Sequence, residues 1–166
     1  MRPSVLVILL LITGCAARVA ELPQRAVSLP PIDLTKLDGV HTTLRAELAG
    51  HPGLVSLWAT WCDTCLAELG ALTRLAPRAA EKGAFVIAIS EGEDRATVSA
   101  FVKNRGLAYA QLLDERFALS DALGTRRVPA TLVLDREGRV VWRGAALDEA
   151  ALQALDRVIA EEPPHD

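Results

Sequence analysis

Two cysteines separated by two residues, Cys62 and Cys65, are the side chains of this sequence whose type and spacing point most directly to chemistry. They follow Gly53–Trp58, an apolar run with the length of a buried strand, and a helical pattern begins at them. A helix N-terminus has free N–H groups and a partial positive charge, which favour the thiolate form of Cys62. The first helical turn also brings both sulfurs within bonding distance. We therefore expect thiol–disulfide exchange, in which an exposed Cys62 attacks a partner's disulfide and an inward-facing Cys65 releases it.

Other uses of this cysteine pair have less support in the sequence. A structural zinc site needs four ligands, and the three histidines, His41, His51 and His165, show no ligand spacing. A c-type haem would need histidine directly after the second cysteine, where Leu66 stands. A static structural disulfide stays open as an alternative, although closing so short a loop gains little entropy. We expect no metal, and no cofactor besides the redox-active Cys62–Cys65 disulfide.

A third cysteine, Cys15, follows an N-terminal segment with the layout of a secretory signal. A basic start is followed by the apolar run Val5–Ile12 and then by small residues. That run is too short to span a bilayer, which takes about 20 apolar residues. Ile12-Thr13-Gly14-Cys15 resembles a bacterial lipobox, in which cleavage before the cysteine leaves its sulfur to carry a diacylglyceryl group. An ordinary signal peptide with an incidental cysteine is the alternative. We predict a lipoprotein signal peptide at residues 1–14 and lipidation of Cys15.

Charge and length limit the classes of partner and the number of domains. Removing residues 1–14 leaves 152 of the 166 residues, which suits a single domain. Loss of Arg2 with that segment changes the net charge from −3 to −4, with 17 basic against 21 acidic side chains. This balance argues against nucleic acid and against an anionic lipid surface as partners. Attachment to a membrane would then come from the acyl chains on Cys15.

The remaining chain divides into three parts. Residues 15–31 are predicted to be the lipidated N-terminus and a tether, residues 32–160 one domain, and residues 161–166 a disordered tail. Apolar periodicity in the domain predicts three strand–helix units followed by a hairpin and a last helix. This order indicates an α/β fold with a mixed central sheet and helices on both faces. The helix that starts at the cysteines is expected to kink or restart at Pro77 and to end at Gly83.

Two motifs together resemble a known family. Trp58–Glu68 reads WATWCDTCLAE, and Val128–Thr131 reads VPAT about sixty residues later. This pair is similar to the TlpA/ResA-type thioredoxin-like lipoproteins, which are extracytoplasmic thiol–disulfide oxidoreductases of the thioredoxin superfamily. The resemblance spans roughly residues 32–160 and implies a thioredoxin fold.

The resemblance also implies roles for several residues around the cysteines. Pro129 corresponds to the family's cis-proline beside the disulfide, whereas an ordinary trans proline at a strand start would be unremarkable without the resemblance. The backbone of Val128 would pair with an extended client segment as an added strand. Gly144 matches a small residue on the far side of the same groove, and Trp61 an aromatic rim over the active site.

Glu68, three residues after the second cysteine, also matches this family. Residues three apart on a helix are neighbours, so Glu68 can lie near Cys65. A partly buried carboxyl group there would have a raised pKa and could relay a proton to or from Cys65. The alternative is a solvated helix glutamate with no role in the chemistry.

Asp63 and Thr64, between the cysteines, depart from the family pattern, in which the second residue is usually proline. The negative charge of Asp63 beside Cys62 opposes the helix-end effect, and strong oxidants need a stabilised thiolate. We therefore expect a reducing couple, nearer about −270 mV than about −120 mV.

The function that the resemblance implies is reduction of disulfides in client proteins, such as apocytochromes c, outside the cytoplasm. The protein would be lipid-anchored on the periplasmic side, with outer-membrane sorting open in a Gram-negative host, and a membrane electron donor would recharge Cys62 and Cys65. A disulfide oxidant or isomerase on the same fold is one alternative. A non-enzymatic module whose thiols bind Cu(I) or a partner is the other.

Overall fold

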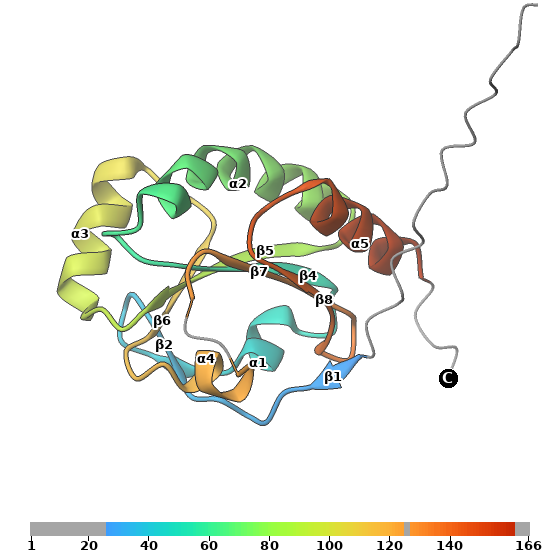
Figure 1. Ribbon diagram of the computed structural model, residues 1–166, viewed down its shortest axis with the longest axis horizontal. Coiled ribbons are helices and arrows are strands. Elements are labelled where there is room, and N and C mark those ends of the chain that lie inside the picture. Colours follow the sequence, from blue (N-terminus) through green and yellow to red (C-terminus); the bar gives the residue numbers. More distant parts are fainter. Residues whose placement is uncertain (1–25, 125–126, 162–166) are drawn as a thin grey trace, which may run out of the picture.

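The computed structural model describes residues 26–124 and 127–161. Within these ranges, eight strands form one mixed sheet that is covered by helices on both faces (Figure 1). This arrangement confirms the predicted α/β fold class. No helix in the described ranges is long and apolar enough to cross a membrane.

The elements follow the predicted order, preceded by three short strands and a short helix. In chain order they are β1 (Val27–Ser28), β2 (Leu34–Lys36), β3 (His41–Thr42), α1 (Leu44–Leu48), β4 (Gly53–Trp58), α2 (Asp63–Glu81), β5 (Phe85–Glu91), α3 (Arg95–Arg105), β6 (Ala110–Asp114), α4 (Ala118–Ala122), β7 (Ala130–Leu134), β8 (Arg139–Gly144) and α5 (Glu149–Ala160). The strands lie in the order β1-β8-β7-β4-β5-β6-β2-β3. The β4–β5 and β5–β6 pairs are parallel, and the other neighbouring pairs are antiparallel.

Strand β4 lies at the centre of the sheet and divides the core into two layers. All six of its residues are buried. Leu54 and Trp58 pack into the layer beneath α2, α3 and α5, whereas Val55 and Leu57 pack into the layer that faces α1 and α4 (Figure 1). Because both faces of β4 are covered, its sequence is a continuous apolar run rather than an alternating one.

The folded domain begins earlier than the expected boundary at residue 32. Val27 and Ser28 form β1, which pairs antiparallel with β8 at the edge of the sheet. The end of the predicted tether, residues 27–31, therefore belongs to the domain. The predicted signal segment, Cys15 and residues 162–166 of the predicted tail lie outside the described residues.

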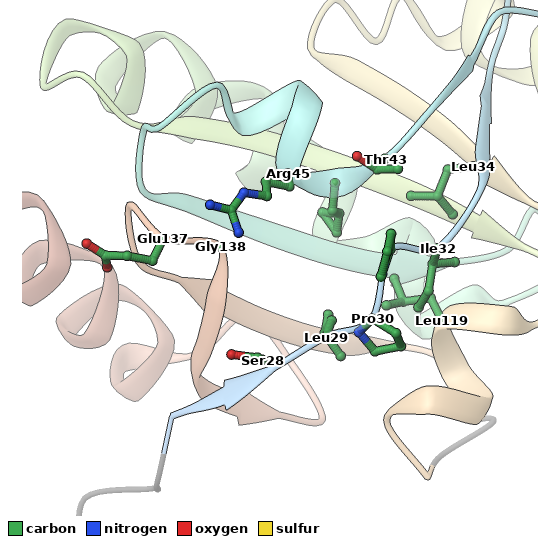
Figure 2. Close-up of a pocket in the computed structure, with 12 residues that line it drawn as sticks. Ser28, Leu29, Pro30, Ile32, Leu34, Thr43, Arg45, Leu119, Glu137 and Gly138 are labelled. Carbon is green, nitrogen blue, oxygen red and sulfur yellow. The ribbon is translucent and has the colours of Figure 1, made fainter.

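The chain after β1 runs across the α1/α4 side of the domain. There it helps to line a cavity of about 190 Å³ together with residues of α1, α4 and the β7–β8 turn. Figure 2 shows Leu29, Ile32 and Leu119 close together at one end of this cavity, with Glu137 at the other. Leu29 and Ile32 pack against the buried cluster on this face. These apolar contacts hold the start of the described chain on the domain.

Helix α2 is continuous from Asp63 to Glu81 and does not restart at Pro77. Proline removes one N–H donor from a helix interior and disfavours it. The helix is nevertheless buried against the sheet on both sides of this residue, through Leu69 and Leu72 before it and Ala79 after it. The packing of its apolar face outweighs the lost hydrogen bond.

Strand β5 ends in a buried carboxyl group, that of Glu91, which is 1% exposed. The Ser120 hydroxyl of α4 donates to Glu91 Oε2 at 2.5 Å, and Oε1 has no partner among the described residues. Burial raises the pKa of Glu91 to about 7, against the lowering effect of the Ser120 hydrogen bond, and the nearby carboxylates of Asp114 and Asp121 add to the rise. Glu91 thus joins the end of β5 to α4, the helix that precedes Pro129.

The raised pKa of Glu91 predicts a pH-dependent stability. The folded state binds this proton more tightly than the unfolded state, in which the pKa is near 4.5. Glu91 therefore lowers the free energy of unfolding as the pH rises from about 4.5 to about 7, and the loss persists above that range. We expect Glu91→Gln to change the free energy of unfolding more favourably at about pH 8 than at about pH 5, with a difference of up to about 3 kcal/mol between the two pH values. Urea unfolding of both proteins at the two pH values measures this, and an equal effect at both would contradict it.

Candidate active site

The two cysteines lie at the junction between the central strand β4 and helix α2. After Trp58 the chain turns, and the backbone N–H of Cys62 donates to the carbonyl of Ala59 at 3.2 Å. Cys62 is the N-cap residue of α2, and its Sγ accepts a hydrogen bond from the backbone N–H of Cys65 at 3.2 Å. The sulfur therefore takes the place of the oxygen that usually caps a helix, where the N–H groups favour negative charge.

Cys62 and Cys65 form a disulfide, with their Cα atoms 5.2 Å apart. Cys65 is 2% exposed, as expected for the inward-facing cysteine, but Cys62 is only 6% exposed. The expectation of an exposed Cys62 is therefore wrong for the disulfide form. Its side chain is turned onto the helix end and belongs to the same buried cluster as Trp58. A client can reach Cys62 only by close docking.

The residues around Cys62 are more exposed than the cysteine itself. Trp61 is 67% exposed, in agreement with a position at the rim of the site. Asp63 and Thr64 are also exposed. The Thr64 hydroxyl lies 3.4 Å from Cys62 Sγ, so the residue that replaces the family's proline contacts the sulfur directly.

Glu68 is half-buried one turn after Cys65 on α2. The backbone N–H of Leu147 donates to its Oε1 at 3.2 Å, and its Oε2 is buried without a partner among the described residues. Burial raises the pKa of Glu68, the Leu147 hydrogen bond opposes the rise, and the Asp148 carboxylate adds to it. These contacts argue against a fully solvated glutamate. Whether Glu68 relays a proton to Cys65 stays a prediction.

The peptide bond between Val128 and Pro129 is cis, the conformation that the resemblance implies. Val128 packs against both buried clusters, including the one that contains the two cysteines. Pro129 is followed by Ala130, which begins β7 and pairs with Leu57 near the end of β4, five positions before Cys62. The sheet therefore brings the Val128–Pro129 segment to the end at which the disulfide lies. The pairing of Val128 with a client stays a prediction.

Gly144 ends β8 beside β7 and pairs with Thr131. A Cβ atom added at Gly144 would lie 2.3 Å from the ring of Trp142, which is buried. The small residue is therefore needed first for the packing of Trp142. Gly144 and Pro129 also line one cavity of about 320 Å³, so both predicted groove residues border the same hollow.

Glu93, which the sequence analysis did not single out, supports the turn before the cysteines. Its carboxylate accepts hydrogen bonds from the backbone N–H of Thr60 at 2.8 Å, from the Thr60 hydroxyl and from the Ser90 hydroxyl at 2.7 Å. Thr60 and Glu93 are 33 residues apart in sequence. Both residues follow buried strands, and the parallel pairing of β4 with β5 brings the carboxyl ends of these strands to one edge of the sheet. The predicted order of the strands is therefore the signal that could have related Thr60 to Glu93.

Among the described residues, no group of three or more His, Cys, Asp or Glu side chains is placed to hold a metal ion.

Comparison with known proteins relates most of the chain to one family and to named enzymes. The family model described as Redoxin matches residues 24–159. The thiol:disulfide interchange protein DsbE of Pseudomonas fluorescens biotype C is 32% identical over 152 residues, which cover 83% of each chain. The thiol-disulfide oxidoreductase ResA of Halalkalibacterium halodurans is 32% identical over 108 residues, 65% of this chain and 61% of that protein.

Solved structures agree on the fold. A thiol:disulfide interchange protein of the thioredoxin family from Chlorobium tepidum superposes with a TM-score of 0.68 at 21% identity, over 82% of this chain and 99% of that one. A secreted thiol-disulfide isomerase from Corynebacterium glutamicum superposes with a TM-score of 0.70 at 23% identity, over 81% and 86% of the two chains. At these identities the likeness establishes the fold alone, and it confirms the expected thioredoxin fold.

The proton-relay hypothesis predicts that Glu68→Gln slows disulfide exchange and flattens its pH dependence. The glutamine keeps an oxygen that can accept the Leu147 N–H but cannot exchange a proton, so we expect rates about tenfold lower where a relay is needed. Rates measured with a small dithiol between about pH 6 and pH 9 test this. Glu81→Gln, at an exposed position near the end of the same helix, is the matched control. An unchanged profile for Glu68→Gln would leave the carboxyl group a structural role only.

Proposed function

Because this chain belongs to the redoxin family and is a thiol-disulfide oxidoreductase of the DsbE/ResA type, we propose that it reduces disulfide bonds of client proteins outside the cytoplasm. The observation that supports this most is the placement of the cysteine pair. Cys62 caps α2 and Cys65 lies buried in the first turn behind it, with the two joined in a disulfide. One sulfur can form a bond to a client while the other stays in position to break it.

The reaction consists of two exchange steps at the client's disulfide. In the reduced protein, the Cys62 thiolate attacks one client sulfur, the client's S–S bond breaks, and the second client sulfur leaves as a thiolate that takes up a proton. Cys65 then loses its proton and attacks Cys62 Sγ, the bond between Cys62 and the client breaks, and the first client sulfur leaves as a thiolate that takes up the second proton. The client gains two electrons and two protons, and the Cys62–Cys65 disulfide forms. Glu68, one turn after Cys65 on α2, would accept the proton of Cys65 in the second step.

The charges next to Cys62 support the reducing direction. The exposed carboxylate of Asp63 follows Cys62 directly, which disfavours a second negative charge on the sulfur. A strong oxidant owes its potential to a stabilised thiolate in the reduced form. The Thr64 hydroxyl near Cys62 Sγ acts in the opposite direction, because a hydrogen-bond donor stabilises a thiolate. We expect the full charge of Asp63 to outweigh this contact.

A lipid on Cys15 would hold the domain at the outer surface of a membrane. A membrane protein that passes reducing equivalents outward would then return the disulfide to the dithiol, since an oxidising compartment holds no reduced thiol pool for this purpose. Clients such as apocytochromes c, whose cysteines must be kept reduced, fit this activity. If Cys15 carries two or more acyl chains, attachment is stable without basic residues.

The reduction potential separates a reductase from a disulfide oxidant on the same fold. We expect a value nearer about −270 mV than about −120 mV, because Asp63 disfavours the thiolate. Equilibration of the purified protein with defined glutathione or dithiothreitol mixtures measures the potential. We expect Asp63→Asn to raise it, since removal of the negative charge stabilises the reduced thiolate. A value above about −180 mV for the parent protein would favour the oxidant or isomerase.

Natural clients can be captured by replacing the cysteine that releases them. In the full-length Cys65→Ala variant, we expect Cys62 to stay in a mixed disulfide with its partner, which a dithiol reductant then frees for identification. The Cys62→Ala variant is the matched control, because its remaining thiol is the more buried of the two. Equal capture by the two variants, or no capture by either, would contradict the proposed roles of the cysteines.

A further inference from the structure

The turn that joins β4 to α2 is held by a carboxylate from another connection of the chain, that of Glu93 between β5 and α3. The backbone N–H of Thr60 donates to Glu93 Oε2 at 2.8 Å, and the Thr60 hydroxyl donates to Oε1. The Ser90 hydroxyl also donates to Oε2, at 2.7 Å. Hydrogen bonds to an ionised group are stronger than those between neutral groups. Thr60 is therefore held at two points, through its backbone and through its side chain.

The rest of this turn offers little packing that could replace the contact with Glu93. The side chain of Trp61 is 67% exposed, and the N–H of Cys62 donates to a carbonyl within the turn itself, that of Ala59. Cys62 Sγ must lie at the end of α2 to accept the hydrogen bond from the Cys65 N–H. The position of Thr60 therefore bears directly on the position of Cys62, two residues later.

The disulfide and the dithiol forms depend on this turn to different degrees. In the disulfide form, the covalent bond to Cys65 holds Cys62 Sγ against α2. Reduction breaks that bond, and the sulfur is then kept at the helix end by the turn and by the hydrogen bond from the Cys65 N–H. A contact that fixes the turn thus stabilises the dithiol form more than the disulfide form. Such a contact raises the reduction potential, since the potential measures the free energy of one form relative to the other.

We propose that Glu93 is a positioning residue for thiol–disulfide exchange, which acts through Thr60 to keep Cys62 at the N-terminus of α2 when the disulfide is open. Its two hydrogen bonds to Thr60 raise the reduction potential and hold the sulfur where a partner's disulfide can be attacked. The inference concerns exchange in either direction, so it does not depend on the proposed reductase function.

Removal of the Thr60 hydroxyl tests the inference without a change of charge. In the full-length Thr60→Val variant, the contact with Glu93 Oε1 is lost, whereas the backbone donor to Oε2 is kept. We expect the equilibrium with dithiothreitol to shift about threefold to tenfold towards the disulfide form of the protein. A tenfold shift corresponds to a potential about 30 mV more negative. Thr60→Ser, which keeps the hydroxyl, should have the potential of the parent protein.

Thr97→Val is the matched control, because Thr97 contacts Asp94 at the start of α3 in the same way. Its backbone N–H donates to one carboxylate oxygen at 3.0 Å, and its hydroxyl donates to the other at 2.7 Å. The variant loses the same kind of hydrogen bond, but no residue of the turn is involved. We expect its urea midpoint to fall equally in the disulfide and dithiol forms, with an unchanged potential. For Thr60→Val, we expect the midpoint to fall further in the dithiol form.

Variants of Glu93 itself separate positioning from charge. Glu93→Asp keeps the charge on a shorter side chain, and we expect it to lower the potential as Thr60→Val does. If Glu93→Gln raises the potential while Glu93→Asp and Thr60→Val leave it unchanged, the carboxylate acts through its charge and the inference is wrong. Equal losses of stability in both forms of Thr60→Val, with an unchanged potential, would likewise overturn it and leave Glu93 a purely structural contact.

Discussion

The hydrogen bond from the Cys65 N–H to Cys62 Sγ is the interaction on which the site depends. It places the sulfur at the positive end of α2 and fixes the distance between the two cysteines. The bond forms only because β4 ends where α2 begins, with the turn at Ala59 and Thr60 between them. Burial of β4 on both faces fixes the strand, and the Glu93 carboxylate holds Thr60 from the neighbouring β5. The chemistry of the pair thus relies on contacts among β4, α2 and β5, which are consecutive elements of the chain.

Three glutamates near the carboxyl end of the sheet show how hydrogen bonding decides the behaviour of a carboxyl group. Both oxygens of Glu93 accept hydrogen bonds. Glu68 and Glu91 each have one bonded oxygen and one buried oxygen without a partner among the described residues. Burial without full hydrogen bonding disfavours the charged form, so their pKa values rise. Glu68 lies one turn after Cys65 on α2, where the proton-relay hypothesis concerns it, whereas Glu91 lies under α4, where its burial bears on stability.

The features that could be predicted from the sequence are those that local signals determine. The bounds of β4 follow from an unbroken apolar run, and the cysteine spacing identifies the chemistry without further context. The features that were missed depend on contacts between distant parts of the chain. Glu93 contacts a residue 33 positions earlier, and α2 continues through Pro77 because of its packing on the sheet. The conformation of Pro129 was expected only from a family resemblance, since spacing alone favours a trans bond.

The burial of Cys62 means that a client must dock closely on the protein before disulfide exchange can begin. In the disulfide form Cys62 is 6% exposed, so a thiol that attacks it needs a partner surface that fits closely over it. The exposed side chains beside it, those of Trp61 and Asp63, are therefore among the first groups that a docking partner meets. Selectivity in this protein then resides mainly in the surface that positions the client, because the exchange reaction itself makes no distinction between one disulfide and another of similar thiol pKa.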